Sequence, residues 1–267
     1  MCGIAGYSLR PDSCVDRTLA AQALLAGIAE RGADAVGYAH RTRGTGPATV
    51  VKQRSGASEL LDRIDVPQAA THLLVHVRDY TKGHPSIAAN NHPVRHGSVV
   101  GIHNGIIVND DEILGRFPCA RLEPDMTVDS EAIFALAEHS AGDPRALEQL
   151  RGSMATAWID ERRPDSLHLA RGFGRPLWIG TDRDCTFFAS TRLALEVAER
   201  YARRSGLRLR KRELRHGTHL VLRDGGIVLN SRFRPDLAFV EENPLPAVRA
   251  PREAEFCLTR LAALAAA

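Results

Sequence analysis

The sequence has few aromatic residues, few lysines and no long apolar run. Aromatic side chains make up 5% of the 267 residues, and only three of the 35 basic residues are lysine. No apolar segment approaches the ~18 to 20 residues that a membrane-spanning helix needs. The first seven residues also lack the basic stretch and following apolar stretch of a secretory signal. We therefore expect a protein without a membrane segment that works in the cytoplasm.

Cysteine and histidine are present, but neither is spaced as a metal site requires. The five cysteines are Cys2, Cys14, Cys119, Cys185 and Cys257. They form no CxxC pair, which argues against a disulfide framework and against a zinc knuckle. Four histidines fall close together at His84, His92, His96 and His103, but at irregular intervals. We interpret these four as solvated loop residues and expect neither a metal nor another cofactor.

The charge balance does not call for a nucleic-acid partner. The chain has 35 basic and 32 acidic residues, which gives a net charge of +3 at pH 7. Arginines concentrate between 201 and 215, with Glu199 and Glu213 alongside them. A solvated helix end and an edge strand are the favoured interpretation of this segment, and we predict no binding to nucleic acid.

Apolar periodicity predicts a layered α+β domain with helices flanking many antiparallel strands. Helices are predicted at 15–31, 58–64, 129–138, 144–150, 193–201 and 253–266. Strands are predicted at 3–8, 36–40, 48–52, 70–78, 98–102, 155–159, 167–170, 177–181, 186–189, 218–223 and 226–230. The four strands between 155 and 189 are predicted to form a meander, and the last two strands a hairpin. We place the domain at 1–240, followed by a Pro-rich segment and helix at 241–267 that could dock on a partner.

The polar segment 79–97 is the longest predicted loop. Loops above ~12 to 15 residues within a compact domain are usually functional or disordered. This segment is therefore the first candidate for a lid over an active site.

Cys2 is the most informative residue for chemistry. A small second residue normally leads to removal of the initiator methionine, and the α-amine of Cys2 would then be free. Its pKa near 7.7 to 8.0 lets the amine accept the thiol proton, so one residue would supply both nucleophile and base. The alternative for Cys2 alone is a small buried hydrophobic residue.

Asn104 and Gly105 follow the predicted strand 98–102. An Asn-Gly pair is a strong signal for a hairpin turn. It could equally form an oxyanion hole, in which the Asn104 amide and the Gly105 N–H point at a developing negative charge. The residues alone leave both interpretations open.

Arg78 and Asp129 are candidates for binding a charged substrate. Arg78 ends a predicted strand at the entrance to the long loop, and its guanidinium suits a carboxylate. A surface arginine is the alternative. Asp129 opens a predicted helix, where it is either an N-cap or the partner of a substrate ammonium group.

Together these segments resemble the class II glutamine amidotransferase domains of the N-terminal-nucleophile (Ntn) hydrolases. The segment MCGIAG at 1–6 is similar to the family's MCGI(A/V)G, RGADAVG at 31–37 to RGxDSxG, HVRDYTKG at 76–83 to HxRxxTxG, HNGIIVN at 103–109 to HNGxIxN, and DSE at 129–131 to D(S/T)E. The order and spacing also match, and the resemblance covers about residues 2 to 200. These motifs are most similar to those of the glutaminase domains of glucosamine-6-phosphate synthase and phosphoribosylpyrophosphate amidotransferase.

The resemblance implies a four-layer αββα sandwich of two antiparallel sheets, the Ntn-hydrolase fold. It implies that Cys2 is the nucleophile and that Asn104 and Gly105 form the oxyanion hole. By the same resemblance Arg78 binds the α-carboxylate of L-glutamine and Asp129 its α-ammonium group. Thr81 belongs to the glutamine-binding loop. Three further matching residues are expected to support the site from behind, namely Arg31, Asp34 and His103.

The glutamine loop departs from the glucosamine-type pattern at three positions. Asp79 and Lys82 stand where that pattern usually has Trp and His, and His84 replaces an acidic residue. Such changes could alter how the loop closes while leaving the nucleophile intact.

The resulting hypothesis is a glutaminase subunit that hydrolyses L-glutamine through a γ-glutamyl thioester on Cys2. Too little chain follows residue 200 for a synthase domain, so we expect a separate synthase as the ammonia acceptor. The sequence is also compatible with a homo-oligomer. The alternatives are hydrolysis of another γ-glutamyl amide and a non-catalytic glutamine-binding regulatory module.

Overall fold

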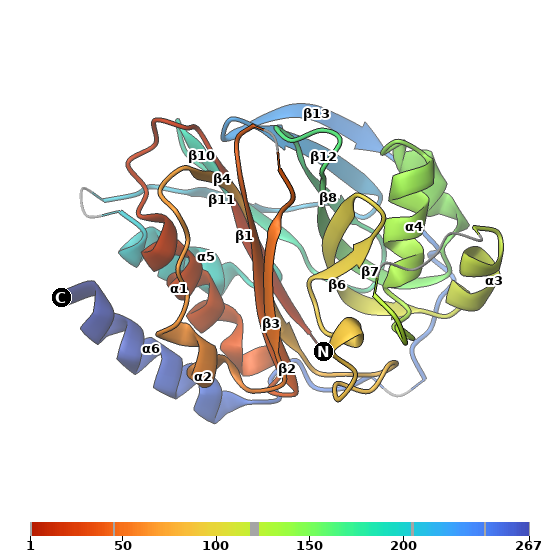
Figure 1. The fold of residues 1–267 in the computed structure, drawn as a ribbon, viewed down its shortest axis with the longest axis horizontal. Coiled ribbons are helices and arrows are strands. Elements are labelled where there is room, and N and C mark those ends of the chain that lie inside the picture. The colour runs from red at the N-terminus through yellow and green to blue at the C-terminus, as the bar shows by residue number, and fades with distance from the viewer. Residues whose placement is uncertain (1, 45, 118–122, 204–205, 243, 267) are drawn as a thin grey trace.

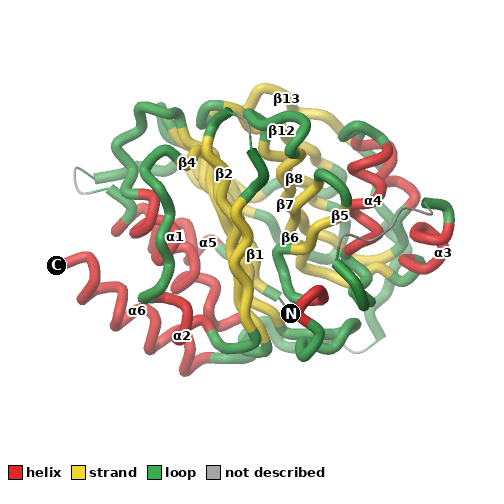
Figure 2. The backbone as a smooth tube through the Cα atoms, viewed as in Figure 1, coloured by secondary structure: helices red, strands yellow, loops and turns green. Residues whose placement is uncertain are grey.

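Two antiparallel β-sheets face each other, and helices cover the outer face of each sheet (Figures 1 and 2). The computed structural model describes residues 2–44, 46–117, 123–203, 206–242 and 244–266. Within them the layers follow the order helix, sheet, sheet, helix. The predicted αββα sandwich and its α+β class are thereby confirmed.

The first sheet has seven strands, and the strand that follows Cys2 lies in its middle. The strand order is β11(Arg210–Glu213), β9(Trp178–Thr181), β10(Cys185–Ala189), β1(Gly3–Leu9), β4(Ala70–Arg78), β2(Ala35–Thr42) and β3(Thr49–Gln53). The helices that cover this sheet are α1(Arg17–Ile28), α2(Ala57–Leu61), α5(Arg192–Tyr201) and α6(Pro251–Ala266). Both edges of β1 are paired, with β10 on one side and β4 on the other, so the backbone next to Cys2 is held in place.

The second sheet has six strands and carries the Asn-Gly motif. The strand order is β13(Gly226–Arg232), β12(Thr218–Arg223), β8(Leu167–Arg171), β7(Gly152–Asp160), β6(Val99–Ile107) and β5(Val94–His96). Helix α4(Glu131–His139) packs on its outer face, with α3(Asp110–Gly115) beside it. The predicted hairpin of β12 and β13 is confirmed, as is the edge position of β11 within the arginine-rich segment.

Three apolar cores separate the four layers. One lies between the sheets and includes Ile4 of β1 together with Val100 and Ile102 of β6. The other two lie under the helices of each sheet. Side chains two apart on a strand point to the same face. The alternation therefore directs Cys2 and Asn104, each two residues away from one of these core residues, toward the space between the sheets.

Two predictions about strands were wrong. The four strands between 155 and 189 do not form one meander, because β7 and β8 belong to the six-stranded sheet while β9 and β10 belong to the other. Short apolar strands carry no signal for the sheet they join. The strand predicted at 98–102 extends to Ile107, so Asn104 and Gly105 lie within β6 and do not form a hairpin turn.

Shorter elements also differ from the predictions. The segment Pro144–Gln149 is a 3₁₀ helix, and the predicted loop at 79–97 contains the 3₁₀ turn Ala88–Asn90 and strand β5. Helix α3 was not predicted at all. Among the described residues, no helix has both the length and the apolar character needed to cross a membrane.

The C-terminal helix α6 lies along α1 and α2 (Figure 1). Cys257 and Leu261 of α6 are buried in the core beneath the seven-stranded sheet. The Glu253 carboxylate accepts hydrogen bonds from the backbone N–H and the hydroxyl of Ser58, at 2.8 and 3.0 Å, at the start of α2. The division of the chain at residue 240 and a docking role for 241–267 stay predictions.

Candidate active site

Cys2 lies half-buried immediately before β1, at the end of the sheets where the long loop begins. Its Sγ donates a hydrogen bond to the backbone oxygen of Asp79 at 3.4 Å. Burial raises the pKa of the thiol, while its backbone hydrogen bond with Asp79 and the positive charge of Arg78 act in the opposite direction. A base that removes the thiol proton is therefore needed for nucleophilic attack.

Asn104 is a buried amide that has no hydrogen-bond partner in the described part of the chain. Its side-chain oxygen and nitrogen are both fully enclosed, and neither is paired with another described residue. An unpaired buried amide costs ~1 to 3 kcal/mol of stability, which is why such groups are rare away from functional sites. This amide is available to donate to a ligand atom in the space between the sheets.

Gly105 stands where no other residue fits. Its φ is +150°, and a Cβ added here would lie 2.0 Å from the backbone oxygen of Ser153. The glycine thus permits the close approach of β6 and β7, and it lines the same pocket as Cys2.

Arg78 ends β4 and points into the loop that follows it. Its guanidinium donates to Oδ1 of Asn91 at 2.7 Å, to the backbone oxygen of Lys82 at 2.9 Å, and to the backbone oxygen of Gly83. The side chain is buried, and burial lowers its pKa. The guanidinium therefore holds the start of the loop at the place where a substrate carboxylate is expected.

Asp129 is buried and lines the same pocket. Its Oδ2 accepts a hydrogen bond from the backbone N–H of Ile107 at 2.7 Å. Its side chain does not cap α4, whose N-cap residue is Ser130. Burial raises the pKa of Asp129 to about 6, so the carboxylate is ionised at neutral pH and can bind an ammonium group.

Of the three residues predicted to support the site, His103 lines the pocket, whereas Arg31 and Asp34 do not. Arg31 is buried at the end of the 3₁₀ turn Ala29–Arg31, and its Nε and Nη2 have no partner among the described residues. Asp34 accepts from the backbone N–H of Tyr80 at 2.9 Å. His103 Nδ1 lies 2.8 Å from the Ser130 hydroxyl, and burial lowers its pKa to about 3, which keeps the ring neutral.

The pocket among these residues is nearly closed. Six predicted residues line it, namely Cys2, Arg78, Thr81, His103, Gly105 and Asp129. The remaining three, Asn104, Arg31 and Asp34, are not part of its lining. The cavity volume is about 10 Å³, which is room for about one water molecule. A substrate larger than water can enter only if the loop that carries Thr81 moves.

Comparison with known proteins identifies the arrangement. Residues 78–197 match the protein family described as glutamine amidotransferase domain. Glutamine–fructose-6-phosphate aminotransferase [isomerizing] from Shigella flexneri is 33% identical over 214 residues, which are 73% of this chain and 32% of that protein. The enzyme of the same name from Shouchella clausii is 30% identical over 210 residues, 73% of this chain and 33% of that protein. This chain contains a class II glutamine amidotransferase domain.

Solved structures show the same fold for the amidotransferase domain. Glutamine phosphoribosylpyrophosphate amidotransferase from B. subtilis, complexed with ADP and GMP, has a TM-score of 0.65 and 20% identity, with 86% of this chain and 49% of that chain covered. A structure titled the allosteric regulatory enzyme of purine biosynthesis gives the same values. The chain thus spans about a third of the curated relatives and about half of these solved chains.

Three histidines of the amidotransferase domain are not solvated, contrary to the prediction. His92, His96 and His103 are buried, and only His84 is exposed. His92 lines the pocket and stacks on His76 with 4.2 Å between ring centroids. His96 belongs to β5, the edge strand of the six-stranded sheet, and His92 directly precedes that strand, which a count of polar residues could not reveal. His92, Tyr80, Val128 and Ser130 line the pocket and were not predicted.

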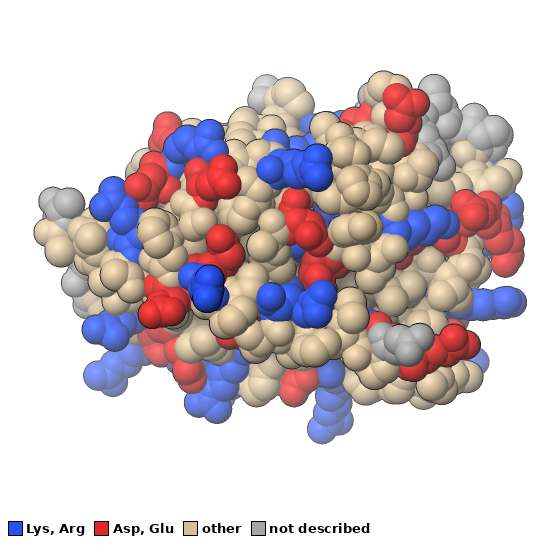
Figure 3. All heavy atoms as spheres, turned by 90° about the horizontal axis from the view of Figure 1, so that it is seen from below, with Lys and Arg blue, Asp and Glu red and all other residues tan. Residues whose placement is uncertain are grey.

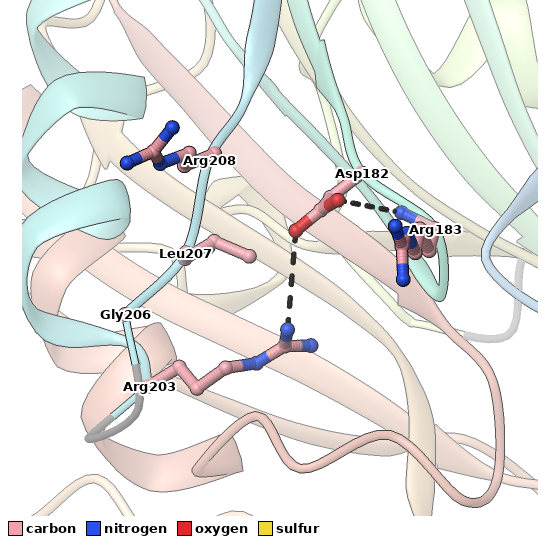
Figure 4. Close-up of a pocket in the computed structure, with 6 residues that line it drawn as sticks. All are labelled: Asp182, Arg183, Arg203, Gly206, Leu207 and Arg208. Atoms are coloured by element: carbon pink, nitrogen blue, oxygen red, sulfur yellow. Dashed lines mark hydrogen bonds and ion pairs between the residues drawn. The ribbon is translucent and has the colours of Figure 1, made fainter.

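A second hollow lies at the opposite end of β1 and is lined by arginines (Figure 4). Asp182, Asp184 and Cys185 are close enough there to share an ion. However, Arg203 donates to both carboxylate oxygens of Asp184 at 2.7 Å and lies 3.9 Å from Asp182. The guanidinium already occupies the place of a cation, so the pair Asp182 and Asp184 is better explained by Arg203 than by a metal.

Proposed function

We propose that the amidotransferase domain hydrolyses L-glutamine to glutamate and ammonia through a thioester on Cys2. In the proposed reaction Met1 is removed and the α-amine of Cys2 takes the thiol proton. The thiolate then attacks the carbon of the glutamine side-chain amide. The resulting oxyanion receives hydrogen bonds from the Asn104 amide and the Gly105 N–H.

The same amine then supplies the proton with which ammonia leaves, and a γ-glutamyl thioester remains on Cys2. Water attacks the thioester after losing a proton to the amine, and the second tetrahedral intermediate releases glutamate and the thiol. One water is consumed overall, and the thiol and the amine return to their starting states.

The observation that carries this proposal is the unpaired, buried amide of Asn104. It faces the same space between the sheets as Cys2, and its donor has no structural task among the described residues. Arg78 and Asp129 provide opposite charges at the pocket for the α-carboxylate and α-ammonium groups of the substrate. This pairing supports an α-amino acid with a side-chain amide as the substrate.

We also propose that the ammonia passes to a separate synthase. The curated relatives are about three times as long as the matched part of this chain, and their aminotransferase name belongs to the whole protein. The acceptor chemistry is thus proposed to lie outside the residues described above. No described residue is assigned to it.

Glutamate release from glutamine by the purified protein tests the first proposal, with the N-terminus determined by intact mass. We expect release by the wild type, loss of release in Cys2→Ala, and normal release in Cys14→Ala, which removes an exposed thiol elsewhere. No release from correctly processed protein would contradict self-sufficient hydrolysis. Faster turnover of a γ-glutamyl anilide than of glutamine would favour the other γ-glutamyl amides instead.

A further inference from the structure

The beginning of the glutamine loop is held by ion pairs at two of its residues. Asp79 Oδ1 lies 3.3 Å from Nε of Arg249, far along the chain. Lys82 Nζ lies 2.5 Å from Oδ2 of Asp110, the first residue of α3, and 3.5 Å from Oδ2 of Asp111. Asp79 and Lys82 are two of the positions at which this loop departs from the glucosamine-type pattern. Each of these two positions therefore has a charged partner in the structure.

Arg249 belongs to a segment that we call the strap, residues 236–242 and 244–250. Figure 1 shows it running along the lower edge of the molecule toward α6, and Figure 3 shows that face, where acidic and basic groups are interspersed. The backbone N–H groups of Arg249 and Ala250 donate to the Glu30 carbonyl at 2.8 and 2.9 Å. Glu241 pairs with the buried Arg175 at 2.7 Å. These contacts fix the strap at Glu241 and at Arg249 and Ala250.

The loop held in this way closes the site. The Asp79 carbonyl accepts the hydrogen bond of the Cys2 thiol, and the carbonyls of Lys82 and Gly83 accept hydrogen bonds from the Arg78 guanidinium. A glutamine carboxylate would need that guanidinium, and the cavity holds only about one water. The loop must therefore leave this position before substrate can bind.

We propose that Arg249 and Lys82 are positioning residues that latch the glutamine loop over Cys2 in the free enzyme, so that glutamine enters only when the ion pairs at both residues open. Both cations are partly exposed, at 41% for Arg249 and 42% for Lys82, whereas Asp79 and Asp110 are largely buried, at 11% and 5%. Because water and salt reach the two cations, salt weakens these ion pairs and the latch opens reversibly.

Alkylation of Cys2 by iodoacetamide measures opening without requiring turnover. The rate is read at the Cys2 peptide by mass spectrometry, so the other thiols do not interfere. In Arg249→Ala we expect alkylation about two to five times faster than in the wild type. Arg249→Lys should restore most of the wild-type rate. High salt should accelerate the wild type toward the rate of Arg249→Ala and change the variant less.

Arg260→Ala is the matched control. Arg260 is exposed to a similar degree, at 45%, and pairs with the exposed Asp62, 2.9 Å away, between α6 and the end of α2. Its removal should leave the alkylation rate unchanged. Equal rates for Arg249→Ala, Arg260→Ala and the wild type, together with no effect of salt on the wild type, would overturn the latch.

The direction of the effect separates opening from a simple electrostatic change. The Asp79 charge raises the pKa of the Cys2 thiol, and removing Arg249 leaves that charge less neutralised. Electrostatics alone would therefore slow alkylation, whereas opening accelerates it. Slower alkylation in Arg249→Ala would overturn the proposal.

The kinetic arm rests on the proposed glutamine hydrolysis. If the closed loop excludes glutamine, Arg249→Ala and Lys82→Met should each lower the KM for glutamine, and Arg249→Ala should leave kcat within about twofold. A higher KM in Arg249→Ala would overturn the latch. If Cys2 alkylation accelerates but no variant releases glutamate, the latch stands and the proposed hydrolase fails.

Discussion

Replacing Asn104 with leucine should separate activity from stability. The change keeps the branching and the number of heavy atoms of the side chain but removes the amide donor. Loss of one oxyanion donor costs about 10² to 10³ in kcat, or ~2.7 to 4 kcal/mol of transition-state stabilisation. The Asn104 amide has no hydrogen-bond partner among the described residues. Its removal should thus leave the free energy of unfolding unchanged or raise it by about 1 kcal/mol.

Asn91→Leu provides the comparison, since Asn91 is equally buried but fully paired. Its Oδ1 accepts from Arg78 at 2.7 Å and its Nδ2 donates to the Pro85 carbonyl at 2.9 Å. That substitution should lower the free energy of unfolding by about 2 to 4 kcal/mol. Urea unfolding and glutamate release, measured on both variants, give the two numbers. Equal destabilisation by both variants, or a kcat loss below about tenfold in Asn104→Leu, would refute the assignment.

The remaining predictions concern three further residues of the site. Arg78→Ala should raise the KM for glutamine by about 10- to 100-fold with a smaller effect on kcat, as initial rates at varied glutamine would show. Asp129 must be ionised to bind an ammonium group, so kcat/KM should fall as the pH drops through about 6. Because its pKa is raised in the folded state, this carboxyl should lower stability as the pH rises from about 4 to 6, and Asp129→Asn should remove that slope from urea unfolding. Gly105→Ala should lower the free energy of unfolding by at least ~2 kcal/mol, because the new Cβ would meet the Ser153 carbonyl. A decrease under about 1 kcal/mol would contradict the steric conflict expected at this positive φ.

Short motifs in the sequence were enough to predict the residues of the candidate site. Cys2 and the pair Asn104 and Gly105 lie in short segments in which neighbouring residues alone suggest the chemistry. The structure places all three next to the space between the sheets. Alternating apolar residues likewise predicted most strands. These features depend on neighbours in the sequence, which is where periodicity carries information.

Long-range pairing was not predictable. Nothing local indicates that β8 and β9 join different sheets, or that Asp79 meets Arg249, 170 positions away. The burial of His92 has the same origin, since the loop that carries it packs against residues from another strand. Such contacts depend on the geometry of the assembled layers, and the composition of the sequence does not predict them.

The central place of β1 has a consequence for the nascent chain. The ribosome synthesises β1 well before its neighbour β10, which begins only at Cys185. At about 5 to 20 residues per second, synthesis of the intervening chain takes on the order of ten to forty seconds. During that interval one edge of β1 stays open, with a thiol beside it, and an open apolar edge can pair with another chain. The seven-stranded sheet is therefore completed around β1 only late in synthesis.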